Sequence, residues 1–223
     1  VALEVMARAP QRVQALVISG SSAAFGNADG RWQAEFLAQR LDPLDAGRIT
    51  DVYRNMSYIK YGAGNTEYDR EHTWPNSLGF PGNTGNLGLP NALYTDTHML
   101  WLSDTGYNSN RGNKPYANCD ASCGERVTEV NGGVGGGSGA YPGNSNWVRG
   151  PDGNQGSFEV WKEMKGEMAR AIFYMAIRYE GGVYPTSGQN EPQLELTDIR
   201  SNIVQINNYS QTAYMGLLAD LLA

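Results

Sequence analysis

Residues 69–77 read Asp-Arg-Glu-His-Thr-Trp-Pro-Asn-Ser, a run of ionisable groups ahead of a proline-constrained turn. The chain has only two histidines, so any imidazole chemistry must use His72 or His98. A lone histidine is more often structural than catalytic, but the charged neighbours of His72 favour catalysis. In a strand, Glu71 and His72 point to opposite faces, so both reach one site only if the backbone bends near Pro75. This stretch is the candidate catalytic centre.

A second polar segment follows at residues 96–114. It opens with Asp-Thr-His at 96–98 and includes Asn108, Arg111 and Lys114. Its Asn, Asp and Ser oxygens suit Mg²⁺, which keeps several waters and takes only one or two protein ligands. Arg111 and Lys114 carry the charge needed to hold phosphate oxygens. Without the first stretch, this segment would be an ordinary polar turn or helix cap.

The bulk composition limits the class of protein. A length of 223 residues fits one domain, and 28 glycines with 10 prolines indicate a loop-rich chain. The net charge of −6 argues against a nucleic-acid binder, which usually carries a basic field. A local basic groove is still compatible with this charge, because salt screens such attraction beyond about 10 Å. The sequence contains no apolar run of about 18 residues, so no membrane contact is expected.

The two cysteines, Cys119 and Cys123, are close in sequence. Two thiols exclude a zinc site of four thiolates. A local disulfide that closes a small loop is the favoured interpretation, and it would indicate an oxidising compartment. The alternative is a pair of free thiols beside a glycine-rich surface loop.

Hydrophobic spacing predicts the elements of the fold. The clearest is a core helix over residues 158–179, whose apolar residues recur every three or four positions and which Gly181 and Gly182 end. Helices are also expected at 32–41, 45–56 and 210–222, and a helix followed by a short strand in 1–20. Over residues 69–116 the sequence predicts short strands and loops, with a helix after Ser103. Over residues 117–156 it predicts a long surface loop.

Four segments, in order along the chain, resemble one known family. They are residues 70–77 (Arg-Glu-His-Thr-Trp-Pro-Asn-Ser), 96–100 continuing to 107–116, 165–175 with 178–180, and, more weakly, 192–196. Together they resemble the endonuclease I family of extracellular and periplasmic nucleases, which belongs to the ββα-metal group, also called His-Me finger or HNH-like. The resemblance runs from about residue 55 to the end of the chain.

The resemblance implies a role for each matching residue. His72 corresponds to the general base that deprotonates the attacking water. Glu71 and Asn108 correspond to the positions that hold one divalent ion, Mg²⁺ or alternatively Mn²⁺ or Ca²⁺. Three basic side chains are assigned to the nucleic acid: Arg111 as a catalytic phosphate contact, and Arg70 and Lys114 as substrate-binding residues. The expected products carry 5′-phosphate and 3′-hydroxyl ends.

The resemblance also implies the architecture and the setting. It predicts an α+β fold in which a ββα-metal core, at about residues 66–116, is embedded in a mostly helical single domain, 1–223, with long loops. The expected protein is a monomeric, secreted or periplasmic, sequence-nonspecific endonuclease. It would contact DNA, or alternatively RNA, through backbone phosphates.

The sequence departs from the family pattern in places that leave alternatives open. Met99 stands where relatives usually carry a second histidine or an asparagine, and Trp101 replaces a basic or polar residue. His98 has two interpretations: support for the metal site, or a buried hydrogen-bonded histidine, which is favoured. Two rival functions follow: a catalytically impaired nuclease fold that only binds, and a calcium-stabilised extracellular structural domain. The order of preference among single-stranded DNA, duplex DNA and RNA stays open.

Overall fold

The computed structural model describes residues 41–42, 45–60, 66–80, 93–183, 188, 190–206 and 211–222. The helix and strand expected in residues 1–20, and nearly all of the helix expected at 32–41, lie outside the described residues. The single-domain prediction stays a prediction. In the part of the chain described, no helix is both long enough and apolar enough to cross a lipid bilayer.

The described strands form four small sheets. β1 (Leu41–Asp42), β2 (Asp45–Thr50) and β3 (Ser57–Ile59) make an antiparallel sheet, as do β6 (Gly124–Arg126), β7 (Asn146–Arg149) and β8 (Ser157–Glu159). β4 (Tyr68–His72) pairs antiparallel with β5 (Leu100–Asp104), and β9 (Gln193–Thr197) pairs parallel with β10 (Thr212–Gly216). In the described residues the α-helices are α3 (Thr105–Arg111), α4 (Lys165–Arg178) and α5 (Leu218–Leu221), and the 3₁₀ turns are η2 (Asn76–Leu78), η3 (Leu93–Thr95), η4 (Lys162–Met164) and η5 (Arg200–Asn202).

The β4–β5 pair and α3 form one unit around the candidate catalytic stretch. Tyr68 pairs with Asp104 and His72 with Leu100, and α3 starts as soon as β5 ends. The Asp104 carboxylate caps α3 by accepting from the backbone N–H groups of Gly106 and Tyr107 at 2.8 and 3.1 Å. The helix packs against both strands. The strands and the helix expected after Ser103 are therefore confirmed.

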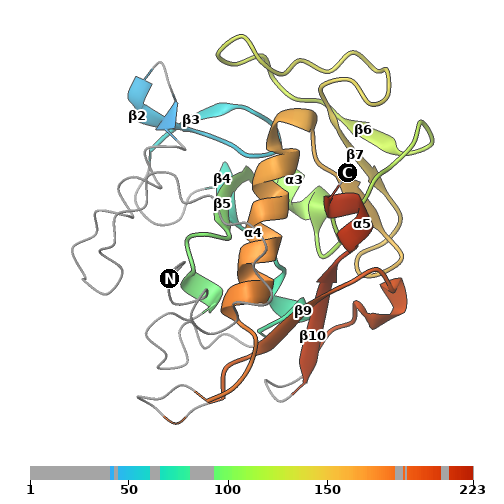
Figure 1. The fold of residues 1–223 in the computed structure, drawn as a ribbon. Coiled ribbons are helices and arrows are strands. Elements are labelled where there is room, and N and C mark those ends of the chain that lie inside the picture. The colour runs from blue at the N-terminus through green and yellow to red at the C-terminus, as the bar shows by residue number, and fades with distance from the viewer. Residues whose placement is uncertain are drawn as a thin grey trace.

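Helix α4 crosses the middle of the molecule, with the β9–β10 pair at one of its ends (Figure 1). Its apolar stripe is buried as the spacing predicted, with Met168, Ile172 and Met175 almost fully covered. The helix begins at Lys165 rather than near 158, because residues 157–159 pair with β7 as strand β8 instead. These buried side chains belong to a core cluster that gathers residues from Val52 to Leu217.

Two expected helices are wrong. Residues 45–50 form strand β2, and residues 51–54 form a turn. Ile49 pairs with Tyr58 across the sheet, and both side chains pack with Tyr68 in a small second cluster. At the C-terminal end, only residues 218–221 are helical, because Ala213 and Met215 alternate into the core from β10, which pairs with β9.

The expectation of a mostly helical domain is not borne out by the described residues, of which 24% are helical, whereas the α+β class is confirmed. The long loop expected at 117–156 contains two short strands, β6 and β7. Cys119 and Cys123 form the expected disulfide within it. The free-thiol alternative is therefore excluded.

Candidate active site

Glu71 is a buried carboxylate held from two sides. It lies on β4 with 2% of its surface exposed. Its Oε1 atom accepts hydrogen bonds from Arg111 Nη1 at 2.8 Å and from the Tyr53 hydroxyl at 2.7 Å. Burial raises the pKa of Glu71, while the Arg111 charge and the Tyr53 hydrogen bond oppose that rise. Both donors use the same carboxylate oxygen, and no hydrogen bond from a described residue reaches Oε2.

Arg111 is built into the protein interior. It is 1% exposed, at the end of α3. Its Nη1 also donates to the His72 carbonyl at 2.9 Å, and its Nη2 donates to the Thr73 carbonyl at 2.6 Å. The guanidinium carbon lies 4.7 Å from the centre of the Tyr116 ring. These contacts favour a structural role, in which the buried guanidinium holds Glu71 and the end of β4, over the predicted phosphate contact. Among the described residues, the Arg111 Nε atom has no hydrogen-bond partner.

His72 is fixed in one tautomer by its surroundings. Its ring lies between those of Tyr94 and Phe80, with centroid distances of 4.8 and 5.7 Å. Nε2 lies 2.9 Å from the Tyr94 carbonyl oxygen. A carbonyl can only accept, so Nε2 carries the proton and Nδ1 keeps a free lone pair. Burial lowers the pKa of His72, the hydrogen bond to the Tyr94 carbonyl opposes this shift, and the charges of Arg70 and Arg111 add to it. The imidazole is therefore neutral near pH 7 and has one basic nitrogen.

Asn108 lies on α3, three residues before Arg111 and hence on the same face of the helix. It is half-buried, and among the described residues its side chain makes no hydrogen bond. The Asn108 amide oxygen and Glu71 Oε2 thus accept no hydrogen bond from a described residue, and both are available to coordinate a metal ion. They lie on α3 and β4, which pack together. One carboxylate and one amide oxygen, completed by water, are a donor set that suits Mg²⁺. Within the described residues there is no cluster of three or more His, Cys, Asp or Glu side chains that could bind a metal by itself.

The two residues assigned to substrate binding differ in position. Lys114 is buried, and its Nζ donates to the Asn110 carbonyl at 3.1 Å and to Asp152 Oδ1 at 2.7 Å. These contacts favour a structural role, which ties the end of α3 to Asp152, over the predicted contact with phosphate. Arg70 is exposed on β4 and, two residues before His72, points to the same side of the strand.

His98 lies in a separate polar cluster. Its Nδ1 is 3.0 Å from Asp96 Oδ1, and its ring stacks on that of Tyr174 with centroids 4.3 Å apart. Asp96 Oδ2 accepts from the hydroxyls of Tyr174 and Tyr179 at 3.0 and 2.8 Å. His98 is therefore a hydrogen-bonded residue, as favoured from the sequence, although its side chain is 30% exposed rather than buried. The cluster anchors the turn that presents the Tyr94 carbonyl to His72.

Three tyrosines of this site have no functional signal in the sequence. Tyr53 falls within the helix expected at 45–56, and the sequence predicts no role for Tyr116 or Tyr94. A tyrosine that donates to a buried carboxylate has the same sequence signature as one that only packs. A pairing across 18 residues, as between Tyr53 and Glu71, has no local signal in the sequence.

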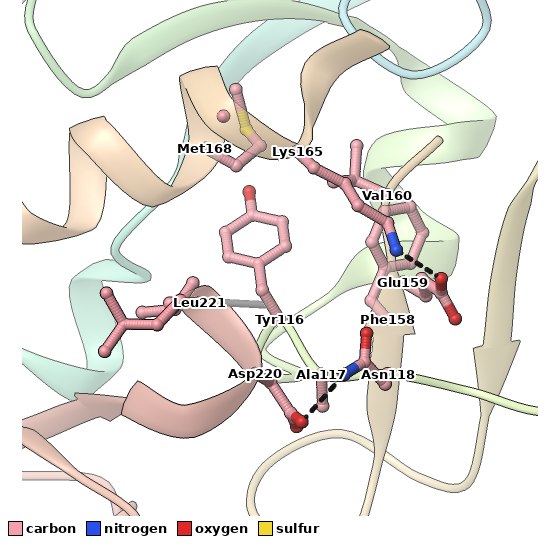
Figure 2. Close-up of a pocket in the computed structure, with 12 residues that line it drawn as sticks. Tyr116, Ala117, Asn118, Phe158, Glu159, Val160, Lys165, Met168, Asp220 and Leu221 are labelled. Carbon is pink, nitrogen blue, oxygen red and sulfur yellow. Dashed lines mark hydrogen bonds and ion pairs between the residues drawn. The ribbon is translucent and has the colours of Figure 1, made fainter. Parts of the chain in front are cut away.

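A pocket of about 260 Å³ lies beside this site, between the start of α4, strand β8 and helix α5. Figure 2 shows Tyr116 at its centre, with Met168 above it and Leu221 to one side. Its rim carries the ion pair of Lys165 with Glu159, at 2.6 Å, and the hydrogen bond of Asn118 with Asp220. The pocket shares Tyr116 with the Arg111 cluster, and His72 does not line it.

Comparisons with known proteins bear on this site. The model of the family described as Endonuclease I matches residues 35–213. An extracellular ribonuclease of Bacillus amyloliquefaciens is 32% identical over 186 residues, which cover 81% of this chain and 49% of that protein. An extracellular ribonuclease of Bacillus subtilis (strain 168) is 30% identical over 166 residues, which cover 72% and 45%. The chain spans about half the length of these curated relatives. No solved structure matches the chain.

Proposed function

The chain belongs to the endonuclease I family, as its motifs predicted, and we propose that it is an extracellular nuclease that hydrolyses phosphodiester bonds. The observation that carries this proposal is the state of His72. The hydrogen bond to Tyr94 leaves Nδ1 as a free base on a neutral ring, which is what removal of a proton from water requires.

His72 acts as the general base in this proposal. Nδ1 takes a proton from the attacking water, and the ring becomes positively charged. The Tyr94 carbonyl, which accepts from Nε2, stabilises that charge and keeps the ring in one orientation. Phe80 and the Tyr94 ring restrict rotation of the imidazole, so the basic nitrogen is oriented before substrate arrives.

Glu71 and Asn108 are the residues that would hold one divalent ion, Mg²⁺ in the first instance. When bound, the ion supplies positive charge for the scissile phosphate and for the leaving 3′-oxygen. Arg111 favours the ionised form of Glu71 against the effect of burial and orients the carboxylate inside the protein. In this proposal β4, β5 and α3 are the two strands and the helix of a ββα-metal core.

The substrate in this proposal is nucleic acid contacted mainly through phosphates. The exposed Arg70 provides positive charge on the same side of β4 as His72. Both relatives are named ribonucleases, so RNA stands beside DNA as a substrate. The Cys119–Cys123 disulfide agrees with a location outside the cytosol.

The substrate class is tested by digestion of matched single-stranded RNA, single-stranded DNA and duplex DNA with Mg²⁺, followed by analysis of the product ends. We expect metal-dependent cleavage of at least one of them, with 5′-phosphate and 3′-hydroxyl ends. Products with 2′,3′-cyclic ends would reject a water nucleophile, and 3′-phosphate ends on DNA would reject the 3′-oxygen as the leaving group. Binding without cleavage would favour the impaired binding module, and Ca²⁺ binding that only stabilises the fold would favour the structural domain.

A further inference from the structure

Four buried side chains form a closed ring behind the candidate metal site. Glu71 pairs with Arg111, Arg111 lies over the ring of Tyr116, and the Tyr116 hydroxyl is 2.6 Å from that of Tyr53. The Tyr53 hydroxyl completes the ring by donating to Glu71 at 2.7 Å. None of the four is more than 4% exposed. A polar ring so well buried is fixed by its own hydrogen bonds rather than by water.

The direction of the hydrogen bonds in this ring can be assigned. Tyr53 has one hydroxyl proton, and a carboxylate can only accept, so that proton goes to Glu71. The bond between the two hydroxyls must then use the proton of Tyr116. The chain runs from Tyr116 to Tyr53 to Glu71, so each donation polarises the next toward the carboxylate.

Tyr53 is itself rigidly placed. Its backbone carbonyl accepts from Asn146 Nδ2 at 2.7 Å, and Asn146 is fully buried. Its ring packs edge-on against that of Phe158, with centroids 4.8 Å apart. These contacts come from β7 and β8, so two further strands set the position of the Tyr53 hydroxyl.

We propose that Tyr53 is a positioning residue for the metal ligand Glu71. Its hydroxyl, together with Arg111, occupies Oε1 and fixes the plane of the carboxylate, which leaves Oε2 for the divalent ion. Tyr116 supports this by donating to Tyr53. The inference rests on the proposed role of Glu71 as a metal ligand, and it adds a residue outside the recognised motifs to the site.

The test is Mn²⁺ binding to the whole folded chain, measured by calorimetry and by electron paramagnetic resonance of free Mn²⁺. The Tyr53→Phe variant removes one hydroxyl and keeps the ring against Phe158. We expect it to bind Mn²⁺ about 10- to 100-fold more weakly, the usual loss when a residue that orients a metal ligand is changed. Glu71→Gln identifies the site, because it should abolish that binding.

Tyr141→Phe is the matched control. The Tyr141 hydroxyl also lies within hydrogen-bond distance of a carboxylate, Glu159 Oε2 at 2.9 Å, but outside the ring, and its one proton is shared with the Cys119 carbonyl at 2.8 Å. We expect this variant to bind Mn²⁺ like the wild type, and its thermal unfolding reports the cost of losing one such hydrogen bond. Should Tyr53→Phe fail to fold, Tyr116→Phe serves in its place, with a smaller loss of affinity expected.

The outcomes separate this inference from the proposed function. Wild-type affinity for Mn²⁺ in a folded Tyr53→Phe variant would overturn the positioning role and leave the hydroxyl with stability alone. Absence of a Glu71-dependent Mn²⁺ site in the wild type would overturn it as well. A wild type that binds Mn²⁺ at this site, weakened by Tyr53→Phe, yet cleaves no nucleic acid would support the inference and reject the nuclease. In an active wild type, Tyr53→Phe should raise the Mn²⁺ concentration for half-maximal activity, and saturating metal should largely restore kcat.

Discussion

Arg111 Nη1 lies 2.8 Å from Glu71 Oε1, and the two side chains are 1% and 3% exposed. An ion pair so deeply buried leaves an uncompensated charge when one partner is removed. The Arg111 guanidinium also binds two backbone carbonyls at the end of β4, so one side chain both neutralises Glu71 and fixes the strand that carries His72.

We therefore predict that Arg111→Met lowers the free energy of unfolding by about 3–5 kcal/mol, measured by denaturant titration. The matched control is Arg170→Met, since Arg170 pairs with Glu167 on the exposed surface of α4. An exposed pair contributes about 0–1 kcal/mol, so this variant should unfold almost like the wild type. Equal losses in the two variants would show that Arg111 is not a buried structural cation.

The pH dependence of cleavage follows from the environment of His72. Burial lowers the pKa of His72 below the ordinary histidine value of about 6.5, and a general base works only when it is neutral. Activity should therefore rise with pH, with the midpoint of the acidic limb below 6.5, and be nearly constant from pH 7 upward. A bound cation nearby shifts the midpoint in the same direction, because it also disfavours the charged ring.

The measurement is kcat/KM against pH at saturating Mg²⁺. The same pKa shift makes the stability of the fold depend on pH. A histidine whose pKa is lowered in the folded state stabilises the fold at pH values above its unfolded pKa, and this contribution is lost as the pH falls below about 6.5. An acidic limb with its midpoint above pH 7 would be incompatible with the buried, neutral His72 described here.

Arg70 and Lys114 should differ in their response to salt. Arg70 is exposed and forms no ion pair with a described residue, so Arg70→Ala should raise KM and reduce the slope of log(kcat/KM) against log[salt] by about one. Lys114 already binds Asp152 and the end of α3, so Lys114→Ala should leave that slope unchanged and lower the melting temperature. A reduced salt slope in Lys114→Ala and not in Arg70→Ala would reverse these assignments.

The sequence predicted best where local signals coincide. The stretch around His72 combines charged residues with a constrained turn, and Asp104 precedes a short helix that it caps. The spacing of Met168, Ile172 and Met175 in α4, four and then three residues, fits one face of a helix and not one face of a strand. These features need no knowledge of distant parts of the chain.

The failures come from pairing between distant segments. Ile49, Val52 and Tyr53 have helical spacing, yet the strand pairing of Ile49 with Tyr58 determines their backbone. The segment Thr212–Gly216 becomes a strand only because β9 lies beside it. Charge alone could not distinguish Arg111, which pairs with Glu71 inside the protein, from a surface arginine that binds phosphate.

The central claim is that His72 activates water for metal-dependent cleavage, and digestion of RNA and plasmid DNA by the wild type and by His72→Ala tests it most directly. Each protein is incubated with Mg²⁺ and with EDTA, after circular dichroism has shown that both are folded. We predict cleavage by the wild type with Mg²⁺, none with EDTA, and a loss of at least about 100-fold in His72→Ala. Cleavage by His72→Ala at the wild-type rate, or no cleavage by folded wild type with any common divalent ion, would contradict the account.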